Sequence, residues 1–136
     1  MSRTPRSRRL ELAALVAIGG FLGATSRYLV GVAVSGLAGT LAVNAGGSFL
    51  LATLLYAATG SDRFTRELRA VLSTGFLASF TTYSTFAVES ATATPLLAAG
   101  NVAATYGLGI AGVRAGRALA RQLGGGDPAP TPEGVA

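Results

Sequence analysis

Four long stretches without a charged residue constrain this chain more than any other feature. They are Leu12–Ser26, Tyr28–Ser61, Ala70–Val88 and Ser90–Val113. A helix that spans a membrane needs about 20 predominantly apolar residues, and the second stretch is long enough for the end of one span, a turn and most of another. The chain is therefore predicted to be an all-α membrane protein with four transmembrane helices, which cover Leu10–Leu29, Gly39–Ala58, Leu68–Val88 and Pro95–Val113.

Basic residues are distributed unequally between the two sides of such a bundle. With four spans, the N-terminus, the loop at 62–69 and the C-terminus lie on one side, and that side carries every arginine except Arg27. By the positive-inside rule, both termini are predicted to be cytoplasmic in a multi-pass protein of the cell membrane. No basic stripe interleaved with aromatic residues is present, so nucleic acid is not an expected partner.

The two ends of the chain differ in composition from its centre. Residues 1–9 are basic and are predicted to form the cytoplasmic N-terminus, without the cleavage site of a signal peptide. Residues 10–119 are predicted to form the four-helix transmembrane domain. Residues 120–136 are rich in Gly, Pro and Ala and are predicted to be a disordered tail.

Two pairs of glycines have the spacing that allows membrane helices to approach closely. They are Gly19 with Gly23 and Gly112 with Gly116. The same spacing also arises by chance in a chain with 19 glycines.

A polar stripe runs along the second predicted span. Thr40, Asn44 and Ser48 recur every four residues and therefore share one helix face. The side-chain amide of Asn44 offers two N–H donors, which could bind an anion without a full positive charge in the membrane. The alternative is that this amide bonds a neighbouring helix.

The third predicted span contains a run of hydroxyl residues between aromatic rings, from Phe80 to Phe86. Such residues are costly in a membrane unless they face a partner or a polar path. The edges of the Tyr83 and Phe86 rings are weakly positive and could contact a small anion. If the helix breaks in this run, the freed carbonyls could hold Na⁺. If it does not break, the hydroxyls would bond to the preceding turn.

Three further polar residues each allow two interpretations. Asn101 and Thr105 form a shorter stripe in the fourth span, which again suits a polar path or contacts between helices. Arg27 could reach the membrane interface or give a vestibule a positive potential that concentrates anions.

Three motifs in the first three spans resemble the small Fluc/CrcB fluoride channels. They are Gly19-Gly20-x-x-Gly23-Ala24-x-x-Arg27-Tyr28, then Gly39-Thr40-Leu41-x-Val43-Asn44-x-x-Gly47-Ser48-Phe49, and finally Gly75-Phe76 with Thr81-Thr82-Tyr83-Ser84-Thr85-Phe86-x-x-Glu89. The fourth span matches only loosely. The resemblance implies an antiparallel dimer of four-helix subunits, with a broken third helix and fluoride-selective pores at the subunit interface.

The resemblance also implies roles for individual residues. Asn44 would donate to fluoride, Tyr83 and Phe86 would present ring edges to it, and Arg27 would be the vestibule arginine. A central structural Na⁺, which is not transported, would be held by the backbone carbonyls of Ala78 and Thr81. The remaining positions expected along the fluoride path are Thr40, Ser48, Ser84, Thr85, Asn101 and Thr105.

The chain departs from the family pattern at three places. Tyr83 stands where the family has Phe, Ala78-Ser79 where it has two glycines, and Asn101 with Thr105 where it has Tyr and Ser. In addition, the strong arginine bias should fix one orientation in the membrane. The expected partner is therefore a homologous subunit of opposite orientation, and otherwise a second copy in a homodimer.

The expected function is passive export of fluoride from the cytoplasm, which lowers its toxic concentration. An enzyme is not expected, because the chain has no His or Cys and no acidic residue well inside a span. The alternative is a small four-helix multidrug exporter. Such a transporter would need a carboxylate inside its first span, whereas Glu11 lies at the start of that span.

Overall fold

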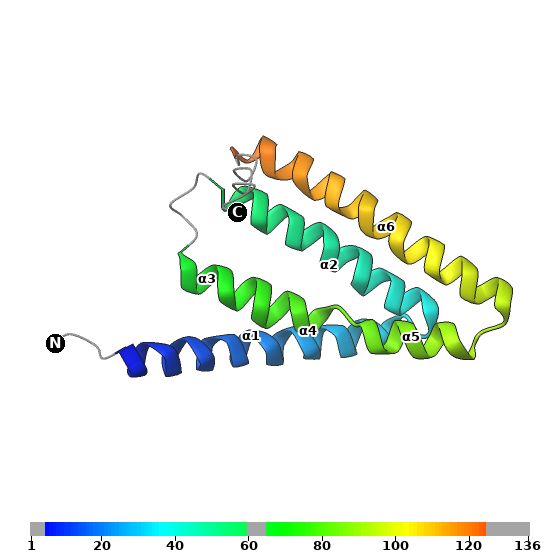
Figure 1. Ribbon diagram of the computed structural model, residues 1–136, viewed down its shortest axis with the longest axis horizontal. Helices are drawn as coiled ribbons and strands as arrows, with labels where there is room; N and C mark the ends of the chain where they lie inside the picture. Colours follow the sequence, from blue (N-terminus) through cyan, green and yellow to red (C-terminus); the bar gives the residue numbers. More distant parts are fainter. Residues whose placement is uncertain (1–4, 60–64, 125–136) are drawn as a thin grey trace, which may run out of the picture.

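The structure, a computed structural model, describes residues 5–59 and 65–124, and within these residues it is helical throughout apart from short turns (Figure 1). The predicted all-α class is confirmed. In chain order the elements are α1 (Pro5–Ala33), α2 (Leu37–Ala57), α3 (Arg66–Ala70), the π-helix η1 (Val71–Leu77), α4 (Ala78–Phe80), α5 (Tyr83–Thr92) and α6 (Pro95–Gln122).

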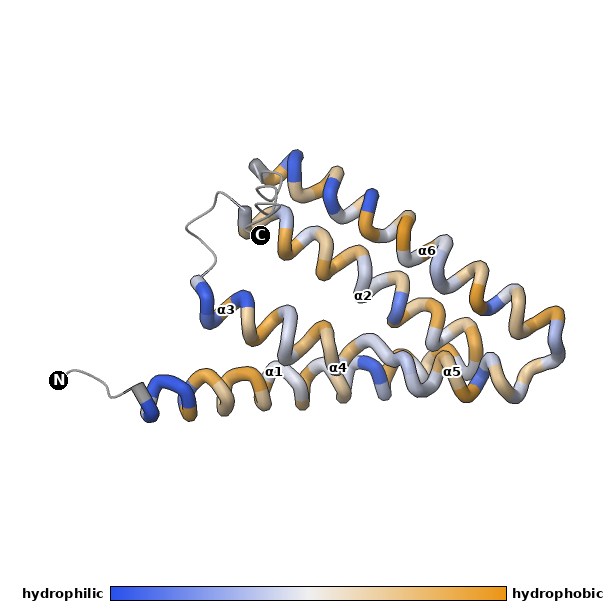
Figure 2. The backbone as a smooth tube through the Cα atoms, viewed as in Figure 1, coloured by the Kyte–Doolittle hydropathy of each residue, from blue (hydrophilic) through white to orange (hydrophobic). Residues whose placement is uncertain are grey.

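Three of these helices, α1, α2 and α6, are long and apolar enough to cross a membrane. Figure 2 shows their apolar residues along most of their length. The third predicted span, Leu68–Val88, is divided among α3, η1, α4 and α5. The last helix, α6, continues through Gln122, three residues into the predicted tail. Residues 125–136 of that tail lie outside the described part of the chain.

The helices pack as two close pairs (Figure 1). One pair is α2 with α6, and the other is α1 with η1 and α4. Both glycine pairs lie in these contacts. A Cβ at Gly19 would come within 2.6 Å of the Val71 carbonyl oxygen, and one at Gly112 within 2.9 Å of the Ala45 carbonyl oxygen. The glycine spacing therefore allows close approach of backbones rather than arising by chance.

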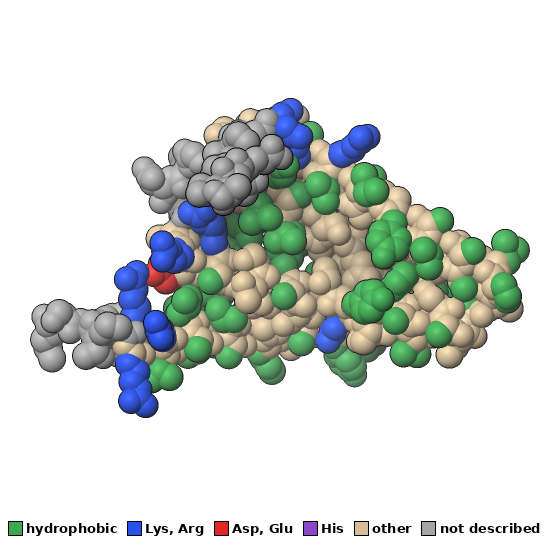
Figure 3. All heavy atoms as spheres, viewed as in Figure 1, with side chains coloured by type: hydrophobic (Ala, Val, Ile, Leu, Met, Phe, Trp, Pro, Cys, Tyr) green, Lys and Arg blue, Asp and Glu red, His purple; other side chains and the backbone are tan. Residues whose placement is uncertain are grey.

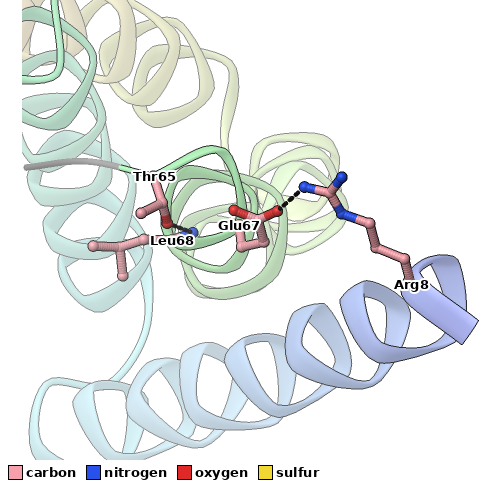
Figure 4. Close-up of polar contacts among 4 residues, drawn as sticks. All are labelled: Arg8, Thr65, Glu67 and Leu68. Atoms are coloured by element: carbon pink, nitrogen blue, oxygen red, sulfur yellow. Dashed lines mark hydrogen bonds and ion pairs between the residues drawn. The ribbon is translucent and has the colours of Figure 1, made fainter. Parts of the chain in front are cut away.

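A polar contact joins the ends of α1 and α3 (Figure 4). Arg8 donates to Glu67 across 2.9 Å, and the Thr65 hydroxyl accepts from the Leu68 N–H at the start of α3. The hydrogen bond from Arg8 holds the pKa of the Glu67 carboxyl below its ordinary value. The contribution of this ion pair to folding stability is therefore fully present above the ordinary pKa of Glu. It is lost as the pH falls through the lowered pKa of Glu67. Because both side chains are exposed, the contribution is small.

The chain has a small core. Among the described residues no large side chain is fully buried. In α6, only 6% of the most apolar 18-residue segment is buried. Basic side chains gather toward the end where α1 and α3 begin and α6 ends (Figure 3). The outward apolar surface fits a lipid environment, and the basic end fits one membrane interface.

Candidate functional site

The third predicted span is interrupted at Thr81 and Thr82. The helix α4 ends at Phe80, both threonines have extended backbone, and α5 begins at Tyr83. Thr82 caps α5, because its hydroxyl accepts from the Thr85 N–H at 3.3 Å. The Thr81 hydroxyl meanwhile donates to the Leu77 carbonyl at 3.1 Å. The hydroxyl run thus supplies both a bond to the preceding turn and the start signal of the next helix.

Asn44 pairs with both backbone groups of Thr82. Its Nδ2 donates to the Thr82 carbonyl at 2.9 Å, and its Oδ1 accepts from the Thr82 N–H at 2.8 Å. The two bonds together fix the orientation of the amide. One N–H of Asn44 is used in this pairing, and the second has no partner among the described residues.

A cavity of about 710 Å³ lies between the α2–α6 pair and the third span. Figure 3 shows a hollow between the α2–α6 pair and the rest of the helices. Seven of the positions proposed from the sequence line this cavity: Asn44, Ser48, Ala78, Thr81, Tyr83, Phe86 and Thr105.

The two aromatic side chains in this cavity differ in exposure. The ring centroids of Tyr83 and Phe86 are 5.9 Å apart, with the planes tilted by 47°. Phe86 is buried, whereas Tyr83 is 77% exposed. The Ser48 hydroxyl donates to the Asn44 carbonyl, so it presents lone pairs rather than a proton to the cavity.

A second cavity, of about 460 Å³, lies on the α1 side of the interruption. It is lined by Arg27, Thr40, Ser84 and Thr85, and Thr82 lines both cavities. The Arg27 Nη1 lies 3.5 Å from the Thr81 carbonyl oxygen. The structure therefore divides the expected path residues between two cavities, and Thr82 contributes to the wall of each.

Asn101 lines neither cavity. It is buried between α5 and α6, where its Nδ2 donates to the Ser90 hydroxyl at 2.9 Å. Three buried oxygens have no partner among the described residues: Glu89 Oε2, Asn101 Oδ1 and Thr105 Oγ1. Such atoms need ordered water or a donor from a neighbouring chain.

Sequence reasoning missed Thr82, Ser90 and Gly47 as members of the site. A Cβ at Gly47 would clash with the Thr81 side chain. The absence of a side chain at Gly47 therefore lets the interruption pack closely against α2. Asn44 and the hydroxyl run were both conspicuous, but their pairing across 38 positions depends on how the helices pack.

The fold and this site define a multi-pass membrane protein with a polar site in its helical bundle. The sequence profile described as "CrcB-like protein, Camphor Resistance (CrcB)" matches residues 14–117. The chain belongs to the CrcB family.

Individual relatives are similar over most of their length. The chain is 52% identical over 108 residues to "Fluoride-specific ion channel FluC 2" of Halobacterium salinarum, covering 79% of this chain and 84% of the relative. It is 48% identical over 117 residues to "Fluoride-specific ion channel FluC 1" of Haloarcula marismortui, covering 86% and 91%. Because the family consists of ion channels, the prediction that this chain is not an enzyme is confirmed.

The contact between Gly47 and Thr81 generates a prediction with a matched control. Gly47→Ala should displace the interruption and destabilise the protein by about 1–3 kcal/mol, as overpacking of a tight contact does. Gly46→Ala, where a Cβ meets nothing within 4 Å, should be neutral or slightly stabilising. Thermal unfolding in detergent measures both, and equal effects of the two substitutions would refute the packing argument.

Proposed function

We propose that this chain is a subunit of a fluoride-selective ion channel that passively exports fluoride from the cytoplasm and so lowers its toxic concentration. The observation that carries the proposal is the convergence of Asn44, Tyr83 and Phe86 on one cavity. The names of the family's relatives support fluoride as the ion.

The chemistry of this cavity suits a weakly held anion. The amide of Asn44 has an N–H left over after its pairing with Thr82, and the two rings offer positive edges. A conducting site must bind its ion and also release it, and neutral donors meet both needs. The charged Arg27 lines the other cavity, where it would raise the local anion concentration.

The two cavities would be successive parts of one path. Ser48 and Thr105 lie with the rings, and Thr40, Ser84 and Thr85 lie with Arg27. Asn101, which the structure places between α5 and α6, would support the wall of the path through Ser90. The multidrug exporter is not favoured, because Glu11, the only carboxylate in the first predicted span, lies within the first two turns of α1 and is exposed.

We propose in addition that the interruption is the break of a third membrane span and holds a structural Na⁺. The carbonyls of Ala78 and Thr81 fit a hard cation, because neither keeps its helical donor. The Thr82 N–H donates to Asn44, and the Thr85 N–H donates to the Thr82 hydroxyl. Two such oxygens from each of two subunits would supply four of the oxygen ligands that hard cations prefer.

The assembly would be an antiparallel dimer, with a homologous subunit of opposite orientation as the partner, or otherwise with a second copy. The small core and exposed Tyr83 support a partner on the open side of the cavity. Several relatives have numbered names, FluC 1 or FluC 2, as expected where one organism has two such chains. The arginine-rich end and both termini would face the cytoplasm.

The channel function is tested by reconstitution, with the homologous subunit where one exists, and measurement of fluoride efflux with a fluoride electrode. Phe86→Ile should lower the flux about fivefold to tenfold, the equivalent of one aromatic contact, while the dimer persists. Phe21→Ile, which changes an exposed ring on α1, should keep normal flux. Lack of fluoride-selective flux in the assembled wild type would overturn the function, and normal flux in Phe86→Ile would reduce that ring to a packing role.

The sodium proposal is tested by replacing Na⁺ with a large organic cation at constant ionic strength. Thermal stability of the assembled protein should fall, because a ligand that binds only the folded state stabilises it. Arg27→Gln should lower the Na⁺ concentration needed for half-maximal stabilisation, since it removes a positive charge near the Thr81 carbonyl. Indifference of the stability to Na⁺ would count against the site.

The orientation is tested by a reporter fused to the C-terminus. Signal is expected from the cytoplasmic side alone, because ten arginines oppose one across the bundle. Replacing Arg114, Arg117 and Arg121 with Gln should reduce that preference. Equal signal from both sides in the unaltered chain would show a dual orientation and favour the homodimer.

A further inference from the structure

We infer that Asn44 is a positioning residue that maintains the interruption. Because Asn44 accepts the Thr82 N–H, the Ala78 carbonyl lacks its helical donor and α4 does not continue into α5. This role is separate from donation to an anion. It rests on the proposed function only where sodium is concerned.

One helical hydrogen bond is missing at the interruption. In a continuous helix the N–H of Thr82 would donate to the carbonyl of Ala78, four residues earlier. The preceding pair keeps this pattern, because the Thr81 N–H donates to the Leu77 carbonyl at 3.1 Å. At Thr82 the pattern stops, and the N–H donates to Asn44 Oδ1 at 2.8 Å.

The backbone N–H of Thr82 needs a hydrogen-bond acceptor from the protein itself. Thr82 is buried, and a buried N–H without a partner is strongly disfavoured, above all in a membrane. If Asn44 did not accept this N–H, the Ala78 carbonyl is the acceptor that a continuous helix would offer it. Taking it would require Thr81 to leave its extended conformation, so that α4 continued beyond Phe80.

The amide of Asn44 is well suited to prevent this rearrangement. Its Nδ2 also holds the Thr82 carbonyl at 2.9 Å, so both backbone groups of one residue are fixed by one side chain. An aspartate would keep the acceptor but lose this donor, and a leucine of similar size would lose both. The three side chains therefore separate the acceptor from the rest of the pairing.

One carbonyl can be observed by itself. Ala78-Ser79 is the only Ala-Ser pair in the chain, so ¹³C-carbonyl alanine combined with ¹⁵N-serine selects the Ala78 carbonyl in solid-state NMR of the bilayer-reconstituted dimer. In the unaltered protein without Na⁺, its chemical shift should lie upfield of the value for a hydrogen-bonded helical carbonyl. A hydrogen-bonded value there would overturn the inference without any substitution.

The variants test the cause. Asn44→Leu should move the Ala78 signal downfield and raise the Na⁺ concentration for half-maximal thermal stabilisation about fivefold, the effect of one competing hydrogen bond. Asn44→Asp should leave the signal in place, because the acceptor remains. Thr53→Val, which removes a hydroxyl from α2 away from the interruption, should change neither measurement.

The outcomes separate this inference from the sodium proposal. An unchanged Ala78 signal in Asn44→Leu would overturn the positioning role. A downfield shift in a protein whose stability is indifferent to Na⁺ would support the positioning role and count against the sodium site.

Discussion

The pairing of the Asn44 side chain with the Thr82 backbone is the interaction on which the site depends. Inside a membrane no water is available to satisfy a backbone N–H or carbonyl, so an interrupted helix survives only where protein groups replace the lost bonds. Asn44 replaces them at Thr82, and the Thr82 hydroxyl replaces another at Thr85. Thr82 lines both cavities, so the pairing with Asn44 holds part of the wall of each.

The glycines allow that pairing to form. Backbones approach closely where α1 meets η1 and where α2 meets α6. In each case the neighbouring backbone lies so near a glycine that a Cβ would not fit. Gly47 has the same effect within the site, since its missing side chain accommodates Thr81. Close packing, rather than a large apolar core, brings the polar groups of separate helices within hydrogen-bond distance.

Much of the fold could be predicted because it follows from local chemistry. Long uncharged stretches indicate membrane helices, and the predicted starts at Gly39 and Pro95 fall within two residues of α2 and α6. Asn44 and the hydroxyl residues between Phe80 and Phe86 could be recognised because such polar groups are costly in an apolar setting. Helix ends were less predictable: α1 and α6 both extend beyond the apolar stretches, because arginine-bearing turns remain helical outside them.

Hydropathy and residue type are local properties, so the amino-acid order was enough to predict an all-helical membrane protein and the residues that are too polar to face lipid. Which of those residues lie in contact follows from the packing of the helices. This packing placed Thr40 and Ser48 in different cavities although they share a helix face, and it directed Asn101 to Ser90. It also joined Asn44 to Thr82, since a contact between distant residues depends on the approach and register of whole helices.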